Sequence, residues 1–255
     1  QPAFAQHLDA AISRLEVLTP EQARQFVDKG YVVIEGAFSR EIAAAVCACA
    51  WDELATPHGV APDDPLTWDK PLQGPRMNGY VRTGGNEARI NLARDAPRAF
   101  DSQLDVVGGA HRLPGQGHSL RWGYGAIGNL GIPGVAWEAP EAQQPGWHKD
   151  GWHFRHFLNS PEQGLIAVPL FSDILPRSGG TFIATDSIAP VARLLADHPE
   201  GIHGDSVQGG GYLVPGLIEQ CHNFTELTGS AGDLVLLHPF ILHRVSVNPT
   251  TRPRF

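Results

Sequence analysis

Two side chains that commonly bind metal ions lie two residues apart in the segment PGWHKDGWHFRHF: His148 and Asp150. On the extended end of a strand, positions i and i+2 project from the same face. An imidazole nitrogen beside a carboxylate oxygen can supply two adjacent ligands for a divalent metal ion. Because the chain has 12 histidines, this short pattern also arises by chance. A third ligand has to come from elsewhere in the sequence.

The candidate third ligand is His243, in the segment GDLVLLHPFILHRVSVN. A turn at Gly232-Asp233 introduces an apolar strand, and such a late strand can return beside an earlier one in a double-stranded sheet fold. Two histidines and one carboxylate on one face of an octahedron leave three positions open, which non-haem Fe(II) oxygenases use for a cosubstrate and O2. His238 competes with His243, but its parity on the strand predicts the opposite face.

Two further histidines support a different hypothesis. His153 and His156 follow His148 closely, so these three form an alternative local cluster. Zinc sites commonly use three protein ligands and a water molecule, so a zinc-dependent hydrolase built on His148, His153 and His156 is a second reading. Either of the two additional histidines can instead be hydrogen-bonded in the core.

Two arginines follow His243 in the segment TTRPRF: Arg252 and Arg254. A dicarboxylate that chelates iron through its 2-oxo acid end needs a fixed cation for its distal carboxylate. The planar fork of an arginine suits that task. The commoner role of one arginine near a chain end is simple surface charge.

The elements that position these residues are predicted from capping and turn signals. Thr19, Pro20 and Gln22 supply an N-cap, a proline at the first helical position and a glutamine at the third. Ser39 caps the second helix, and Gly108-Gly109 lies beyond the end of the third. The predicted helices span about 20–30, 40–54, 95–107 and 188–197, with a strand inserted at 31–34.

The second half of the chain is predicted to be mainly β, because short β-rich runs alternate there with glycine and proline. Two segments, 55–90 and 198–211, are predicted to be surface loops of the kind that often covers an active site. The predicted strands span 119–127, 165–172, 180–184, 212–214, 224–228, 233–237 and 241–247.

Composition narrows the class of protein. The chain has 255 residues and a formal net charge of −8, with its basic residues scattered singly, so nucleic acid is an unsuitable partner. No apolar stretch is long enough to span a bilayer, and the N-terminal segment lacks the features of a secretion signal. Three cysteines, an odd and sparse count, indicate reduced thiols. We therefore expect a cytoplasmic protein that acts on a small molecule and does not bind a membrane.

The order of four segments resembles the phytanoyl-CoA dioxygenase (PhyH) family of Fe(II)/2-oxoglutarate oxygenases, and the resemblance covers most of the chain. LTPEQARQFVDKGYVVIEGAFSREI resembles the family's opening helix, strand and helix, and WHKD resembles its His-x-Asp segment. LPRSGGTFIATDS takes the place of its glycine-rich element, and GDLVLLHPFILHRVSVNPTTRPR resembles its closing segment.

This resemblance implies a fold and a set of site residues. The implied fold is mainly β with flanking helices (α+β), a double-stranded β-helix or cupin-like jelly roll with helices packed on one side. One domain at 1–255 would comprise a helical part at about 1–115 and a β-helix core at about 116–255. Carried over residue by residue, the iron ligands match His148, Asp150 and His243. The arginine that binds the distal carboxylate of 2-oxoglutarate matches Arg254, with Arg252 as the fallback.

The implied activity is hydroxylation of a C–H bond in a small organic molecule, with Fe(II) as the cofactor and 2-oxoglutarate and O2 as cosubstrates. Succinate and CO2 would be released. Related halogenases replace the carboxylate ligand by glycine or alanine, so Asp150 favours oxygenation. Desaturation and cyclisation stay open, as does a cupin-like metal-binding module without oxygenase activity. Trp147 and Trp152 flank the motif, either as packing residues or, for Trp152, at the substrate mouth.

The chain departs from the family pattern in three places. Residues 184–187 lack the usual Pro-Gly and final histidine. Val245 stands where relatives often place a serine that holds the cosubstrate, which leaves Ser246 and Thr181 as open candidates for that contact. Relatives usually continue with another strand beyond the position of Phe255. A C-terminal truncation is therefore left open, and without that strand Arg254 would be poorly held.

Overall fold

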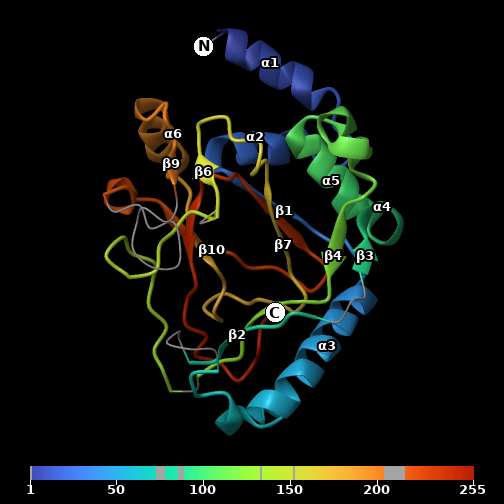
Figure 1. The fold of residues 1–255 in the computed structure, drawn as a ribbon, viewed down its shortest axis with the longest axis vertical. Coiled ribbons are helices and arrows are strands. Elements are labelled where there is room, and N and C mark those ends of the chain that lie inside the picture. The colour runs from blue at the N-terminus through green and yellow to red at the C-terminus, as the bar shows by residue number, and fades with distance from the viewer. Residues whose placement is uncertain (1, 73–77, 86–88, 133, 152, 204–215) are drawn as a thin grey trace.

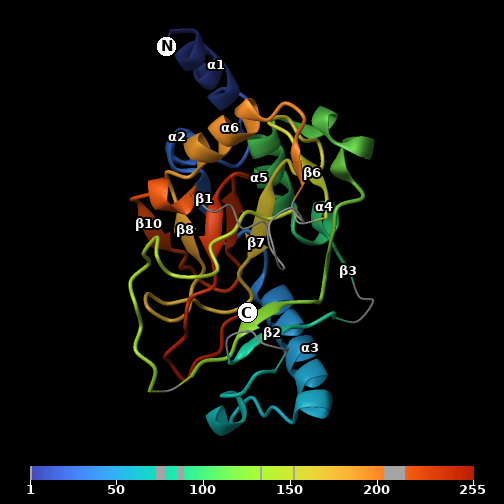
Figure 2. The same cartoon turned by 60° about the vertical axis from the view of Figure 1, so that its left-hand side comes forward.

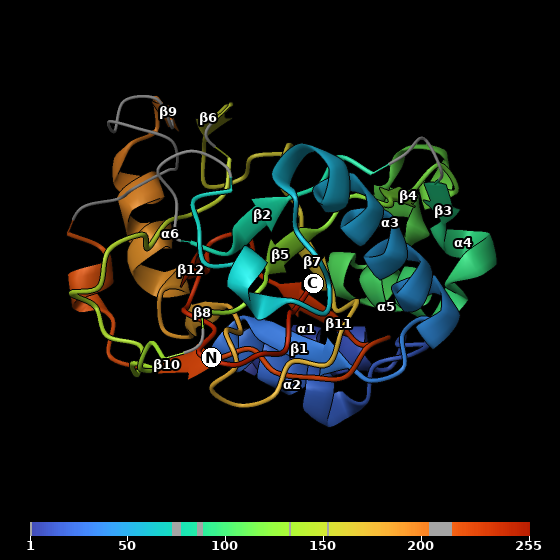
Figure 3. The ribbon, with the colours of Figure 1, turned by 90° about the horizontal axis from the view of Figure 1, so that it is seen from below.

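The computed structural model describes residues 2–72, 78–85, 89–132, 134–151, 153–203 and 216–255 (Figure 1). Helices α3, α4 and α5 lie along one side of the strands (Figures 1 and 3). Helix α6 lies on the opposite side, so the prediction that helices pack on one side is only partly correct (Figure 3). The helices are α1 (Pro2–Ile12), α2 (Pro20–Lys29), α3 (Arg40–His58), α4 (Leu92–Asp95), α5 (Pro97–Val107) and α6 (Ile188–Asp197).

Helix α2 begins and ends where its capping residues predict, and α3 begins at its predicted cap, Ser39. The Thr19 hydroxyl accepts the backbone N–H of Gln22, and the Gln22 side chain accepts the backbone N–H of Thr19. This capping box starts α2, and Gly30 ends it in the left-handed conformation at φ 73°. The third predicted helix corresponds to α5, and the short helix α4, which precedes it, was not predicted. Helix α1, which the capping signals did not predict, extends from the end of the molecule beyond α2 (Figure 2).

All paired strands are antiparallel. One sheet has the order β1-β11-β7, a second has the order β10-β8-β12, and the pairs β2-β5, β3-β4 and β6-β9 stand apart. The strands are β1 (Tyr31–Ile34), β2 (Tyr80–Arg82), β3 (Arg89–Asn91), β4 (Arg121–Gly123), β5 (Ile127–Asn129), β6 (Arg155–His156), β7 (Ile166–Pro169), β8 (Phe182–Ala184), β9 (Ile202–His203), β10 (Phe224–Glu226), β11 (Leu234–Leu237) and β12 (Leu242–Arg244).

Most predicted strands correspond to observed ones, whereas β2, β3, β6 and β9 were not predicted as strands. The run 119–127 is two strands, β4 and β5, because the chain turns between them. The segment 55–90, predicted as a loop, contains the end of α3 and strand β2. The predicted strand at 212–214 and most of the predicted loop at 198–211 lie outside the described residues.

Strand β11 lies at the centre of the core. Its four residues, Leu234–Leu237, are all buried because β1 and β7 pair with its two edges and side chains pack on both faces. Helix α3 buries Ala43, Val46, Ala50 and Leu54, spaced three or four apart along a single face. The largest cluster of buried side chains joins this helix face to the central sheet. Within the described ranges, no helix is both long and apolar enough to cross a membrane.

Candidate metal centre

His148 and His243 are joined by backbone pairing. The N–H of His148 donates to the carbonyl of His243 at 3.0 Å, and the N–H of His243 donates to the carbonyl of His148 at 3.0 Å. This bridge adds the His148 segment to the β10-β8-β12 sheet beside β12. The two rings therefore lie on neighbouring strands, with centroids 4.4 Å apart. The late strand returns beside the His-x-Asp segment, as the sequence predicted.

The two imidazoles are oriented in the same way. Nδ1 of His148 lies 2.8 Å from the carbonyl oxygen of Gly146, and Nδ1 of His243 lies 3.2 Å from that of Ile241. A carbonyl oxygen only accepts, so each Nδ1 carries a proton, and in the neutral form of each ring Nε2 is the nitrogen with the free lone pair. Such hydrogen bonds are the usual way in which a protein fixes the tautomer of a metal-binding histidine.

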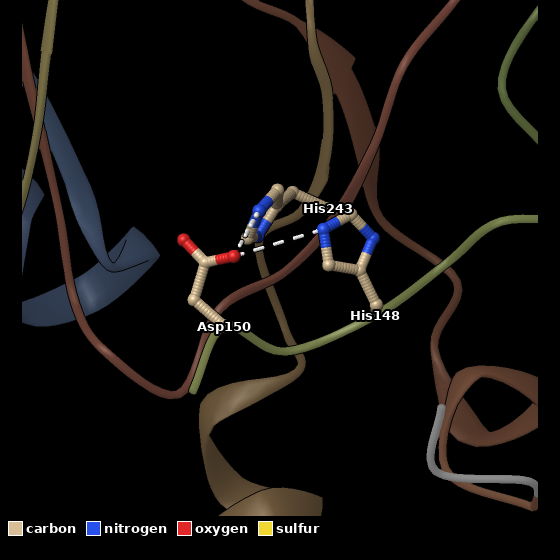
Figure 4. Close-up of side chains that lie close together, drawn as sticks. All are labelled: His148, Asp150 and His243. Carbon is tan, nitrogen blue, oxygen red and sulfur yellow. Dashed lines mark ion pairs between the residues drawn. The ribbon is translucent and has the colours of Figure 1, made fainter. Parts of the chain in front are cut away.

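One oxygen of the Asp150 carboxylate faces both imidazoles (Figure 4). This oxygen, Oδ1, is 3.7 Å from Nε2 of His148 and 3.6 Å from Nε2 of His243. Metal–ligand bonds of about 2.1 Å place neighbouring ligand atoms about 3.0 Å apart in an octahedron and about 3.4 Å apart in a tetrahedron. The observed separations exceed these values only slightly. Among the described residues, these three form a group whose ligand atoms all lie within 4.8 Å of one another.

The charges at this site suit a cation. Burial raises the pKa of the Asp150 carboxyl, but its interactions with His243, His148 and Lys149 outweigh burial and lower this pKa to about 2. Burial lowers the pKa of His148, and the adjacent His243 lowers it further. At neutral pH the site therefore presents one carboxylate and a neutral imidazole from His148, the protonation states that metal binding requires.

The zinc site on His148, His153 and His156 is not assembled. Nδ1 of His156 lies 2.8 Å from Nζ of Lys149, and Nε2 lies 2.6 Å from the carbonyl oxygen of Gly151. Both ring nitrogens of His156 are thus engaged away from His148. His153 is exposed and contacts the ring of Phe154 edge to face. Neither histidine belongs to the group of converging ligand atoms found among the described residues.

His238 does not belong to that group either, but the parity argument for excluding it was wrong. His238 does not share a strand with His243, because it follows the end of β11 and a turn separates it from β12. Its Nδ1 accepts the backbone N–H of Phe240 at 3.1 Å, and its ring packs near Phe26. The turn, rather than the alternation of one strand, directs the ring elsewhere.

Arg254 is buried beside Asn129 of β5 and Gly179. Its backbone pairs with Asn129 of β5, and its Nε donates to the carbonyl of Gly179. Its Nη2 is buried and has no hydrogen-bond partner in the described part of the chain. Burial lowers the pKa of this guanidinium to about 10, against the opposing influence of Tyr80 and Glu226. A buried cation with an unused donor is suited to an anionic ligand.

The expectation that Arg254 would be poorly held is wrong. Flanking Phe255 anchors the segment, because its carbonyl oxygen accepts the N–H of Phe171 at 3.0 Å and its N–H donates to Ser172. The ring of Phe255 is buried against Trp51. Arg252, the fallback, is exposed at a surface pocket. Burial therefore distinguishes the two arginines, because Arg254 is buried and Arg252 is exposed.

The other candidate residues have structural partners. The hydroxyl of Ser246 donates to the carbonyl of Gly180 at 2.6 Å, and the backbone carbonyl of Thr181 accepts the N–H of Leu227. Trp147 is buried, and its Nε1 donates to the carbonyl of Glu141, so its role is packing. Trp152 lies outside the described residues.

The unusual residues at 184–187 join two elements. The hydroxyl of Ser187 donates to the carbonyl of Ala184 at 2.7 Å and accepts the N–H of Leu242 at 2.8 Å. Asp186 accepts the backbone N–H groups of His222 and Asn223. The Ser187 contact holds the end of β8 next to the start of β12, which carries His243, and the Asp186 contacts hold it next to the start of β10.

Sequence reasoning missed two buried polar residues near the site, Asn129 and Lys149. The Asn129 amide donates to the carbonyls of Ser246 and Gly179, which places it beside Arg254. Lys149 separates the two ligands of the His-x-Asp segment and is 1% exposed. The apolar run beside Asn129 was a weak signal for burial, and nothing in the local pattern distinguished Lys149 from a surface lysine.

No protein-family model matches the chain, and no curated protein matches it in sequence. Solved structures do match its fold. EctD from S. alaskensis in its apo form is 20% identical over 95% of this chain and 78% of that chain, with a TM-score of 0.51. The same protein with bound Fe is 19% identical over 94% and 77%, with a TM-score of 0.51.

EctD was also solved with 2-oxoglutarate and 5-hydroxyectoine. In that form it is 16% identical over 96% of this chain and 77% of that chain, with a TM-score of 0.50. A hypothetical protein from Escherichia coli, JW0805, is 16% identical over 93% and 66%, with a TM-score of 0.51. At these identities the likeness is one of fold. This chain thus has a fold related to that of proteins crystallised with iron and with 2-oxoglutarate.

Proposed function

We propose that this protein is a non-haem Fe(II)- and 2-oxoglutarate-dependent oxygenase. One observation carries the proposal: the two Nε2 atoms of His148 and His243 face a single oxygen of Asp150. Two imidazoles and one carboxylate on one face are the ligand set of non-haem Fe(II) oxygenases, and this set leaves open positions on the metal. The likeness of fold to EctD supports the same class.

The three side chains fit an iron ion. Both histidines have their Nδ1 hydrogen-bonded to carbonyl oxygens, so their Nε2 atoms are the available ligands. The carboxylate of Asp150 stays ionised because its pKa is lowered to about 2. When bound, Fe(II) would supply the redox chemistry by which O2 oxidises 2-oxoglutarate to succinate and CO2 and oxidises a C–H bond of the substrate.

Arg254 is the proposed partner of the distal carboxylate of 2-oxoglutarate. Tyr80 and Arg82 share a face of β2, since they are two residues apart, and the Nε of Arg82 donates to the Tyr80 hydroxyl at 2.8 Å. The charge of Arg82 acts on the pKa of His148, and Tyr80 acts on that of Arg254. One strand, β2, thus carries a residue near each of the two groups that a bridging dicarboxylate would contact.

The finer parts of the proposal concern fold and substrate. We propose that residues 1–255 form one domain with a double-stranded β-helix, in which the β10-β8-β12 sheet carries the metal centre. Hydroxylation of a small organic molecule is the reaction that an intact carboxylate ligand favours, because the carboxylate occupies the position that a halide would need. The acidic net charge of the chain gives no attraction toward a strongly anionic substrate.

The test is turnover of 2-oxoglutarate. Protein stripped of metal and reloaded with Fe(II) would be incubated with 2-oxoglutarate in air, alone and with panels of small molecules, and succinate would be measured. We expect iron-dependent succinate formation that substrates accelerate and that His243→Ala abolishes. A protein that binds iron at His148 and His243 but never forms succinate would instead be a cupin-like binding module.

A further inference from the structure

Lys149 lies between the two ligands of the His-x-Asp segment, and its side chain is buried. It is 1% exposed, and its ammonium lies 5.6 Å from the centre of the Phe240 ring. Its Nζ donates to the carbonyl oxygen of Asp150 at 3.3 Å, to Nδ1 of His156 at 2.8 Å and to Oε1 of Gln163 at 2.5 Å. An ammonium has three donors, so all three are used.

All three acceptors belong to the segment that starts at Asp150 and ends at Gln163. His156 extends the network, because its Nε2 donates to the carbonyl of Gly151 at 2.6 Å. The segment folds back tightly on itself there. A Cβ on Gly151 would lie 2.5 Å from the His156 ring, and Gly151 adopts φ +107°. One side chain thus holds both ends of the segment that follows the carboxylate ligand.

The three proposed metal ligands are anchored differently. His148 and His243 hold each other through two backbone hydrogen bonds, and each ring is also fixed at Nδ1. The carboxylate of Asp150 accepts no backbone N–H in the described part of the chain, and 48% of its side chain is exposed. Its position depends on its own backbone, whose carbonyl accepts from Lys149.

The hydrogen-bond network around Lys149 stabilises the fold less than apolar packing at the same position would. Among the described residues, no carboxylate oxygen lies within 4.0 Å of Nζ of Lys149, the longest distance at which the two would form an ion pair. A buried charge without an ion pair is less stable than a well-packed apolar side chain of similar volume. A leucine or methionine would therefore fill this position better if packing were its only role. Its hydrogen bonds to the Asp150 segment indicate a different role.

We propose that Lys149 is a positioning residue, which acts through His156 and Gln163 to hold Asp150 in the geometry that binds the metal. This inference rests on the proposed metal centre at His148, Asp150 and His243. It assigns a role to a residue that touches no metal. Partners that orient metal ligands typically change metal affinity by about 10- to 100-fold when they are removed.

The test uses Co(II), whose visible spectrum reports the geometry of its ligands. Lys149→Met removes the donors and keeps the volume, and we expect Co(II) affinity to fall about 10- to 100-fold with an altered spectrum. Lys70→Met is the matched control, because Lys70 also donates to a backbone carbonyl, that of His58, far along the chain from the ligands. The melting temperature of the metal-free variants shows whether each one folds.

A chemical rescue separates positioning from general stability. Lys149 lines a cavity of about 140 Å³ together with His156 and Gln163, so Lys149→Ala would leave a void that adjoins existing space. We expect propylammonium to restore the Co(II) affinity and spectrum of this variant. Neutral 1-propanol should not, and neither compound should rescue Lys149→Met, in which the void is filled. Should Lys149→Met not fold, Gln163→Met removes one acceptor and should weaken Co(II) binding severalfold.

Two outcomes would overturn the inference: Co(II) affinity and spectrum of Lys149→Met within twofold of the wild type, or rescue of Lys149→Ala by propanol as effectively as by propylammonium. If the proposed metal centre itself were wrong, the Co(II) measurements would give a different result. In that case the wild type would not bind Co(II), or His243→Ala would bind it undiminished. Since succinate formation is not measured, the inference stands or falls separately from the proposed oxygenase activity.

Discussion

The backbones of His148 and His243 are hydrogen-bonded to each other in both directions, each at 3.0 Å. The separation of the two imidazoles is therefore set by sheet geometry and not by their own side chains. Replacing one ring leaves the pairing intact, so ligand variants of this protein should fold. Loss of metal in such a variant then reports the loss of a ligand.

His243→Ala should abolish stoichiometric binding of Fe(II) or Co(II), because two ligands remain of a three-ligand set. We expect affinity to fall by at least 100-fold while the melting temperature of the metal-free protein changes little. Metal content after dialysis, measured by elemental analysis, checks this. His153→Ala is the control and should keep full metal content. Loss of metal from His153→Ala but not from His243→Ala would instead support the zinc site on His148, His153 and His156.

Arg254→Met should weaken binding of 2-oxoglutarate, because it removes the buried cation whose Nη2 has no hydrogen-bond partner among the described residues. Truncating one partner of a buried charge pair costs about 2–5 kcal/mol, so affinity should fall at least 30-fold. Saturating 2-oxoglutarate should raise the melting temperature of the iron-loaded wild type but not of the variant. Arg252→Met is the control, since Arg252 is exposed, and an equal loss there would contradict the assignment.

Gly179→Ala should damage the Arg254 site indirectly. Gly179 has φ +87°, and a Cβ there would lie 2.5 Å from the Cβ of Asn248 and 2.7 Å from Nδ2 of Asn129. Its carbonyl accepts from the Arg254 guanidinium, so a shift of this backbone moves the arginine. Backbone strain and overpacking together should lower the free energy of unfolding by about 2–4 kcal/mol.

Urea unfolding measures that loss, and 2-oxoglutarate binding should weaken in parallel. Gly164→Ala is the control, because no atom lies within 4 Å of a Cβ at that position. The control should change the free energy of unfolding by less than about 0.5 kcal/mol. Equal effects at the two glycines would show that the close packing around Gly179 is not what the substitution disturbs.

Stability should fall at mildly acidic pH through His156. Burial lowers its pKa from 6.5 to about 4, and the charges of Lys149 and His203 act in the same direction. The hydrogen bond to the Gly151 carbonyl and the charge of Glu162 act in the opposite direction. Since burial dominates, the folded protein keeps this imidazole neutral where the unfolded chain protonates it.

The direction in which stability changes with pH follows from the number of protons that the folded and unfolded states bind. Between pH 6.5 and 4 the unfolded state binds the proton and the folded state does not, so the stability present above pH 6.5 is lost as pH falls. At pH 5 the loss is about 2 kcal/mol relative to neutral pH. Urea unfolding of the metal-free protein at pH 7.5 and 5 should show a smaller loss for His156→Gln than for the wild type. Identical losses would exclude His156 as the source.

The local sequence was sufficient for most helices, for the strands of the two three-stranded sheets and for half of the site. Capping residues set the start of α2 and of α3, because a cap satisfies backbone donors within one turn of the helix. Strand periodicity placed His148 and Asp150 on one face, and the structure brings both side chains to one point. These features depend on neighbours a few residues away, so they are readable before the chain is folded.

Tertiary packing decided the rest of the candidate site. Which histidine completes the site depends on antiparallel pairing between segments 95 residues apart, and no local pattern specifies that register. Arg252 and Arg254 are two residues apart with the same chemistry, yet only Arg254 is buried, because Asn129 and Phe255 draw it into the sheet. Lys149 reads as an ordinary surface lysine in sequence. Its burial follows from the fold of the segment after Lys149, since acceptors 1, 7 and 14 residues further along the chain must converge on the ammonium before it can leave water.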